Sequence, residues 1–192
     1  MKIAKIINNN VISVFNDQNE ELVVMGRGLA FQKRPGDDVE EEKIEKIFAL
    51  KNKDISERFK TLLYEVPMEY MDVTEDIIKN AKTKLGRDLN DSIYVSLTDH
   101  INFAIERNKK GLDIKNALLW EIKRLYKDEF SIGKEALKLI EEKLHVSLPE
   151  DEAGFIAMHI VNAELNEEMP NIVNMSNVMQ DILNIVKYHF KI

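Results

Sequence analysis

Side chains suited to contact nucleic acid gather near residues 24–33, where Arg27 stands between two glycines and Phe31 follows four positions later. Glycines on both sides let the backbone and the guanidinium approach a ligand closely. An arginine, an aromatic ring and neighbouring amides on a small sheet suit contact with bases and phosphates. The same glycines also fit a bulge or a tight turn, and both interpretations stay open on these residues alone.

Three consecutive asparagines, Asn8 to Asn10, form the second candidate group. Asparagine tolerates the left-handed backbone and bonds its own main chain, so the run predicts a turn. As base-reading groups, the amides would supply paired donors and acceptors beside Lys5 and Arg27. The turn interpretation is favoured unless another contact joins this segment to the glycine-flanked arginine.

Two of the four histidines, His100 and His159, lie in the middle of long, mostly apolar segments with helical periodicity. Asp99 adjoins His100, and Asn162 lies one turn from His159. One interpretation is a pair of core histidines with satisfied hydrogen bonds. The other is a pair of phosphate acceptors, because a neutral imidazole nitrogen is nucleophilic near pH 7 and a neighbour can fix its tautomer.

Motifs for enzymatic chemistry are absent, which predicts a protein that is not an enzyme and takes no cofactor. The sequence contains no phosphate-binding glycine loop, no serine-hydrolase motif and no zinc-protease motif. It has no cysteine, which excludes disulfides and thiolate chemistry. The histidines are too widely spaced to predict a metal site.

Composition favours a folded protein in the cytoplasm. Hydrophobic residues make up 44% of the chain and charged residues 32%, values typical of globular domains. No apolar run approaches the roughly 18 residues of a membrane helix. The net charge of −7 is uneven, because residues 1–36 hold five basic and three acidic side chains. A mildly basic head on an acidic body is compatible with a local polyanion site.

The first 36 residues predict four short strands joined by turns. The expected strands cover residues 2–7, 11–15, 21–25 and 29–33, and turns fall at 8–10, 16–19 and 34–37. Short connections make this an antiparallel meander. A sheet of this size has little apolar surface for a core of its own, so we expect a second copy to cover its apolar face in a homodimer.

The remainder predicts an all-α bundle, so the fold class is α+β with more than one domain. Expected helices run from about 54 to Pro67, from Thr74 to Gly86, from 91 to 108, from 113 to 126, from Ser131 to 144 and from Pro149 to 165. Thr74 and Ser131 are expected to cap their helices. Residues 171–192 echo the segment around Asp76, and they predict the start of a second, truncated copy of the helical domain.

Four segments of this sequence carry a resemblance to a known family. Lys2 to Val11 (KIAKIINNNV) and Val24 to Gln32 (VMGRGLAFQ) resemble the RNA-binding domain of the BglG/SacY family of transcriptional antiterminators. Leu89 to Phe103 (LNDSIYVSLTDHINF) and Leu148 to His159 (LPEDEAGFIAMH) resemble the first PTS regulation domain of the same family. The resemblance covers essentially the whole chain.

The resemblance implies a homodimeric sheet domain that grips an RNA hairpin and so prevents an overlapping transcription terminator in sugar-utilisation genes, those for β-glucosides in particular. It implies regulation by phosphorylation at His100 and His159 by the sugar phosphotransferase system, through a sugar permease enzyme II and HPr. The residues that it places at the RNA face are Lys5, Asn8, Asn10, Gly26, Arg27 and Phe31.

The domain boundaries expected from these observations are an RNA-binding domain with linker at 1–56, a first PTS regulation domain at 57–170 and the start of a second at 171–192. An alternative function is a phosphoacceptor sensor whose sheet domain serves only to dimerise. Salt-dependent binding of a hairpin RNA separates the two.

Overall fold

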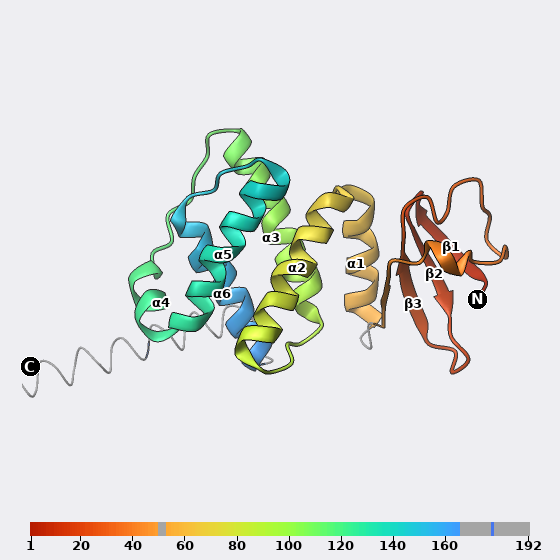
Figure 1. Ribbon diagram of the computed structural model, residues 1–192, viewed down its shortest axis with the longest axis horizontal. Coiled ribbons are helices and arrows are strands. Elements are labelled where there is room, and N and C mark those ends of the chain that lie inside the picture. The colour runs from red at the N-terminus through yellow and green to blue at the C-terminus, as the bar shows by residue number, and fades with distance from the viewer. Residues whose placement is uncertain (50–52, 166–177, 179–192) are drawn as a thin grey trace, which may run out of the picture. The chain divides into compact units, whose positions relative to one another are not determined.

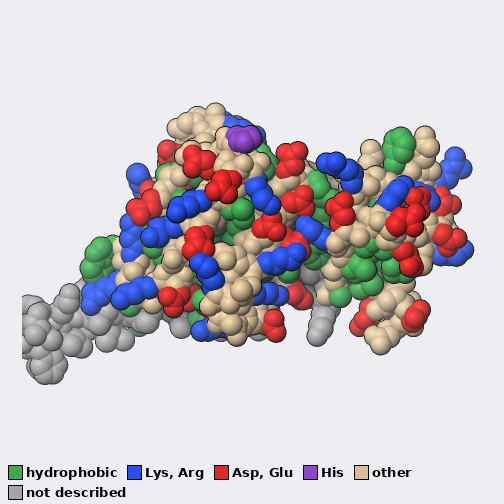
Figure 2. Space-filling view, viewed as in Figure 1, with side chains coloured by type: hydrophobic (Ala, Val, Ile, Leu, Met, Phe, Trp, Pro, Cys, Tyr) green, Lys and Arg blue, Asp and Glu red, His purple; other side chains and the backbone are tan. Residues whose placement is uncertain are grey.

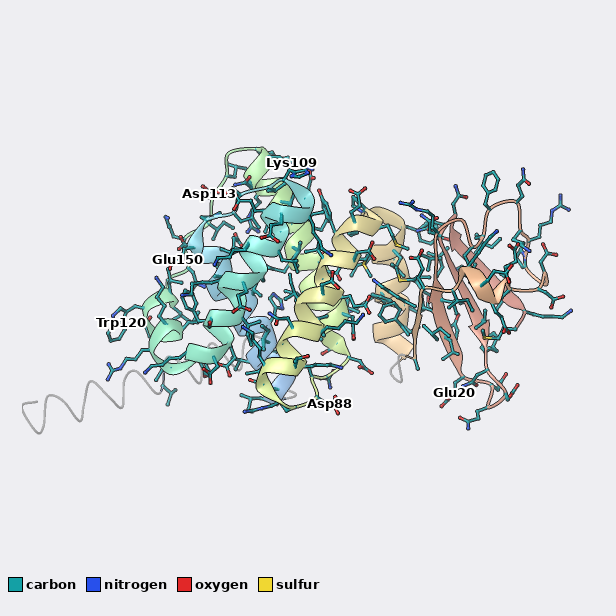
Figure 3. All side chains as sticks on the ribbon, viewed as in Figure 1. Glu20, Asp88, Lys109, Asp113, Trp120 and Glu150 are labelled. Atoms are coloured by element: carbon teal, nitrogen blue, oxygen red, sulfur yellow. The ribbon has the colours of Figure 1, made fainter. Side chains whose placement is uncertain are left out.

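Two compact units make up the structure, Met1–Met68 and Glu69–Ile192, and each is described here by itself. The computed structural model describes residues 1–49, 53–165 and 178 (Figure 1). The first unit holds a sheet and one helix, and the second unit is helical. This confirms the α+β fold class.

The first unit contains a four-stranded antiparallel sheet with strands in chain order, β1-β2-β3-β4 (Figure 1). The strands are β1 (Ile3–Asn8), β2 (Val11–Phe15), β3 (Glu21–Met25) and β4 (Lys46–Phe48). A short 3₁₀ turn, Glu41–Lys43, precedes β4. The asparagine turn joins β1 to β2, and a turn at residues 16–19, closed by the Asn19 N–H on the Asn16 carbonyl, joins β2 to β3. The first three expected strands are therefore confirmed.

The fourth expected strand, at residues 29–33, is wrong. That segment forms successive turns, in which the N–H groups of Leu29, Phe31 and Lys33 each bond a carbonyl three residues back. Gly28 has φ +67°, and this left-handed backbone turns the chain away from β3. The fourth strand is β4 instead, in an acidic stretch where no strand was expected.

Segments of the same unit cover the sheet on both faces. On one face Ile3, Ile12, Val14 and Val24 pack with Leu29, Ala30 and Val39 of the long connection. Helix α1 (Lys53–Glu65) also packs on the sheet: Phe59 meets Phe48 of β4 at 5.0 Å between ring centroids, and the Tyr64 hydroxyl donates to the Ile6 carbonyl at 3.2 Å. The expectation that this sheet lacks a core of its own is therefore wrong, because connection and helix supply the apolar cover.

The second unit is built from five helices within the part of the chain that the structure describes (Figure 1). They are α2 (Met68–Leu85), α3 (Ser92–Lys109), α4 (Leu119–Leu125), α5 (Lys127–Leu144) and α6 (Glu150–Leu165). Their ends follow the expected breakers: Pro67 precedes α2, while Gly86 and Gly111, both with positive φ, follow α2 and α3. No described helix is long and apolar enough to cross a membrane.

Two expected helix caps are wrong. Thr74 lies inside α2 and donates its hydroxyl to the Tyr70 carbonyl at 2.8 Å, and Ser131 lies inside α5. Both helices begin one turn or more earlier, because tertiary packing of Tyr70, Met71 and Phe130 outweighs the local capping signal. The helix expected at 113–126 is shorter, since residues 112–118 form an irregular segment before α4. The possible second copy at 171–192 lies outside the described residues apart from position 178.

Helices α5 and α6 approach so closely that only glycine fits at one crossing point. A Cβ atom on Gly133 would lie 2.2 Å from the carbonyl oxygen of Ala153. The crossing fixes α6, which carries His159, against the rest of the bundle. Beside it, Ile122, Phe130, Ala157 and Met158 form an apolar cluster.

Gly133→Ala is expected to lower the free energy of unfolding by about 1–3 kcal/mol, because the added methyl meets backbone that cannot yield easily. Chemical denaturation measures the change. Ser131→Ala, an exposed position two residues earlier in α5, is the matched control and is expected to change stability by less than about 0.5 kcal/mol. Equal stability of the two variants would contradict this account of the crossing.

Candidate functional site

Asn10 holds the asparagine turn against the glycine-flanked arginine loop. Its side-chain oxygen accepts the Gly28 N–H at 2.8 Å, and its backbone carbonyl accepts the Gly26 N–H at 2.9 Å. A third bond runs from the Ala30 N–H to the Asn9 carbonyl at 3.0 Å. The two candidate segments, eighteen residues apart in the chain, therefore form one surface.

The two glycines of this surface meet different requirements. A Cβ on Gly26 would lie 1.8 Å from the Lys43 carbonyl oxygen, so this position has no room for a side chain. Gly28 has open space around it but adopts φ +67°, which other residues rarely adopt. Together they allow the loop to pass close to residues 43–45 and then turn, which presents Arg27 at the bend.

The expected contact residues divide into exposed groups and supporting groups. Lys5, Arg27 and Phe31 are exposed, and Phe31 shows 61% of its surface to solvent. An exposed aromatic ring is available to stack on a base. Asn8 has a supporting role, because its oxygen accepts the Asn10 N–H at 2.8 Å and its amide donates to the Leu63 carbonyl at 2.7 Å.

The cations around this surface differ in their availability. Lys33 pairs with Glu40 at 2.7 Å. The hydrogen bonds from Lys33 and Lys43 lower the pKa of Glu40 to about 2. By contrast, the Arg27 guanidinium has no acidic partner within residues 1–49 and 53–165; only its backbone N–H is bound, to Glu45 at 3.3 Å. Arg27 is therefore available to meet a phosphate or a base edge.

A second candidate site lies where α3 meets α6. The rings of His100 and His159 stand 4.9 Å apart between centroids. Glu152 on α6 places one oxygen 2.9 Å from His100 Nε2 and the other 2.8 Å from Arg107 Nη2. The side chain of Glu152 is only 3% exposed, so a buried carboxylate joins the two helices through a guanidinium and an imidazole.

His159 is held neutral near pH 7. Burial, and the nearness of His100, lower the pKa of His159 to about 3. A neutral imidazole keeps one ring nitrogen unprotonated and nucleophilic. This is the protonation state that the phosphate-acceptor interpretation of His159 requires.

The neighbours expected to orient the histidines are not the ones observed. Asp99 is exposed, and Asn162 Oδ1 is buried without a hydrogen-bond partner among the described residues. Glu152 and Arg107 take that place instead. A signal for them was present, since Arg107 and Glu152 each lie seven residues from a histidine on the same helix face.

Metal binding finds no support in the residues described. Within them, no group of three or more His, Asp or Glu side chains could hold a metal ion.

The His159 environment predicts acid sensitivity. Because the folded pKa lies below the ordinary value of 6.5, the unfolded chain binds more protons between pH 6.5 and 3, and stability falls as pH falls through that window. Below pH 6.5 the wild type is expected to lose unfolding free energy relative to His159→Asn, by on the order of 1 kcal/mol for each pH unit.

Denaturation titrations at several pH values measure this difference. Glu164 acts in the opposite direction, because burial raises its pKa to about 7, but it is common to both proteins and cancels in the comparison. A difference that stays flat between pH 6.5 and 4 would show that His159 is not held neutral by its surroundings.

Comparison with known proteins places both sites in matched domains. Residues 1–57 match the family described as CAT RNA binding domain, and residues 75–163 match the PRD domain. Over its full length the chain is 76% identical to the transcription antiterminator LicT of Bacillus subtilis (strain 168), covering 69% of that protein. It is 55% identical, again over its full length, to the beta-glucoside operon antiterminator of Dickeya chrysanthemi, covering 68% of it. The crystal structure of GlcT CAT-PRDI matches with a TM-score of 0.72 and 38% identity, covering 84% of this chain and 96% of that one.

Proposed function

We propose that this chain binds an RNA hairpin in nascent mRNA and keeps an overlapping terminator from forming. The chain belongs to the BglG/SacY family of transcriptional antiterminators. The observation that carries the proposal is the surface built around Asn10, which joins two loops and presents Arg27 and Phe31 to solvent. This surface lies within the residues that match the CAT RNA binding domain.

On this surface the residues have separate tasks. Arg27 and Lys5 supply positive charge for phosphates or base edges, and Phe31 supplies a stacking platform. Asn10 and Asn8 hold the loops in register, and the Nδ2 group of Asn10 stays available to a base. Gly26 is itself buried, and it allows the backbone to pass close to residue 43, which supports the bend that carries Arg27.

The helical unit regulates this activity through phosphorylation of His100 and His159 by proteins of the sugar phosphotransferase system, namely a sugar permease enzyme II and HPr. Support comes from the match of residues 75–163 to the PRD domain, from the close approach of the two imidazole rings and from the lowered pKa of His159. The name of the Dickeya relative supports control of β-glucoside genes.

Three organisational features complete the proposal. The chain divides into an RNA-binding domain at 1–56, a regulatory domain at 57–170 and the opening of a second regulatory domain at 171–192. It acts as a homodimer, since an RNA hairpin offers two strands to a symmetric pair of sheets. It works in the cytoplasm, where nascent mRNA and the phosphotransferases meet.

RNA binding is expected to depend on Phe31 and Arg27 through different physics. Phe31→Ala removes base stacking, which lowers affinity by roughly 1–3 kcal/mol with little change in the salt dependence. Arg27→Ala lowers affinity and also reduces the slope of log affinity against log salt by about one. Gel-shift titrations with a hairpin RNA at several salt concentrations measure both effects.

Two substitutions elsewhere serve as matched controls. Phe15→Ala removes an aromatic ring that is 51% exposed, against 61% for Phe31, at the end of β2 away from the asparagine turn. Lys138→Ala removes one positive charge from the exposed side of α5. Both are expected to bind RNA as the wild type does. If the Phe31 and Arg27 variants also bound RNA as the wild type does, the RNA would lie on another surface. If the wild-type chain bound no RNA, the alternative function, a sensor whose sheet domain serves only to dimerise, would be favoured.

Negative charge at the histidines is expected to weaken RNA binding. The double variant His100→Asp/His159→Asp imitates part of the phosphoryl charge, whereas His100→Asn/His159→Asn has nearly the same shape without charge. Moving a two-state equilibrium from mostly active to mostly inactive takes about 5 kcal/mol at most, which charge repulsion beside a buried carboxylate can supply. Equal RNA affinity of the Asp and Asn variants in the same titration would rule out this electrostatic control.

A further inference from the structure

Glu152 and Arg107 are assigned no role by the resemblance or by the comparisons, yet they are the charged groups in direct contact with the histidine cluster. Glu152 Oε1 lies 2.8 Å from Arg107 Nη2, and Glu152 Oε2 lies 2.9 Å from His100 Nε2. The exposed fractions of the three side chains are 3% for Glu152, 17% for Arg107 and 13% for His100. A largely desolvated ion pair therefore sits against the acceptor ring.

Hydrogen bonding in this cluster is incomplete in the unmodified chain. Arg107 Nε and His159 Nδ1 are enclosed without a partner in the described part of the chain. His100 Nε2 and Glu152 Oε2 lie 2.9 Å apart but form no hydrogen bond of acceptable geometry. Buried polar groups are almost always paired, so the enclosed Nε–H donor of Arg107 beside this ring indicates a site prepared for a further acceptor group.

The charge balance shows which acceptor group fits. In the unmodified chain the negative charge of Glu152 and the positive charge of Arg107 cancel. A phosphoryl group on His100 Nε2 adds nearly two negative charges at the position that the Glu152 carboxylate now occupies. Arg107 has one edge in use and its Nε free, and a guanidinium fork matches phosphate oxygens better than a single carboxylate oxygen.

We propose that phosphorylation of His100 exchanges the partner of Arg107: the phosphoryl group takes the guanidinium and displaces Glu152. The inference rests on the proposed phosphorylation and specifies how the site responds to it. In the unmodified chain Glu152 restrains the acceptor ring and ties α6 to α3. After transfer the strong pair, Arg107 with phosphohistidine, lies within α3 alone, and α6 loses its ionic tie to that helix.

The transfer step balances without a further reactant. The lone pair of His100 Nε2 forms the new bond to phosphorus, and the bond between phosphorus and the donor nitrogen breaks. The proton lost by the imidazole passes to the leaving nitrogen. Nothing is oxidised or reduced.

The test uses the full chain with phosphoramidate, a small phosphoryl donor that needs no partner protein. A His159→Asn background restricts the labelling of the cluster to His100, and His100→Asn/His159→Asn gives the background from the histidines at 145 and 189. Phosphorus NMR follows the rate of labelling and the pKa of the attached phosphoryl group. Glu152→Gln, Glu152→Gln/Arg107→Gln and Glu152→Gln/Arg107→Lys are compared in this background, with Lys109→Gln of α3 as the charge control.

Glu152→Gln is expected to accelerate labelling on the order of tenfold, because it removes the displaced charge and leaves Arg107 available. Adding Arg107→Gln is expected to reverse that gain and raise the pKa of the phosphoryl group, since no cation then stabilises its dianion. Adding Arg107→Lys gives an intermediate result, because lysine keeps the charge and lacks the fork. Lys109→Gln is expected to stay within about twofold of the background chain.

The partner exchange would be overturned if Glu152→Gln and Glu152→Gln/Arg107→Gln showed the same labelling rate and the same pKa of the phosphoryl group. It would also be overturned if phosphoramidate did not phosphorylate His100 in the His159→Asn chain. A different result bears on the proposed function instead: if phosphoramidate labels His100 as expected while phosphorylated enzyme II and HPr do not, the site is correct and its assigned donors are wrong.

Discussion

The buried carboxylate of Glu152 is the interaction on which the regulatory site depends. A charged group at 3% exposure is tolerated only when it is paired, because removing one partner leaves an uncompensated charge that costs about 3–5 kcal/mol. Here the partners, Arg107 and His100, both come from α3, so the requirement of a single side chain holds α3 and α6 in register. The same requirement makes the register sensitive to any new charge on the imidazole.

The surface on the sheet unit follows the opposite rule. Its chemistry is exposed, and the buried interactions beneath it are ordinary backbone bonds organised by the Asn10 amide. Arg27 and Phe31 are exposed and therefore accessible to RNA, and hydrogen bonds already order the loops that carry them, which lowers the ordering cost of binding. The RNA contacts proposed for the sheet unit thus depend on exposed, pre-ordered groups. The regulatory response proposed for the helical unit depends on a buried cluster whose hydrogen bonds are incomplete.

Sequence patterns predicted those features that depend on local chemistry. The first three strands, their turns and the helix ends at Pro67, Gly86 and Gly111 follow from periodicity and breakers, and the structure confirms them. The predictions were wrong where a contact with a residue distant in sequence determines the local structure. Leu29 and Ala30 look like strand residues but are buried as turn residues. Strand β4 has only three residues in a charged stretch, which is too short for a periodic pattern to reveal it. Thr74 and Ser131 carry capping side chains that helix packing overrides.

The candidate sites show the same division between local and distant information. Periodicity indicates which side chains share a helix face, and it placed Glu152 on the face of His159, but it cannot show that this face meets His100 and Arg107 of another helix. Similarly, the asparagine run predicts only a turn until the bond from Gly28 N–H to the Asn10 oxygen joins it to Arg27. In both sites the functional property comes from one polar side chain that links two segments. A single amide or carboxylate at such a link determines more of the site than the residues that contact the ligand.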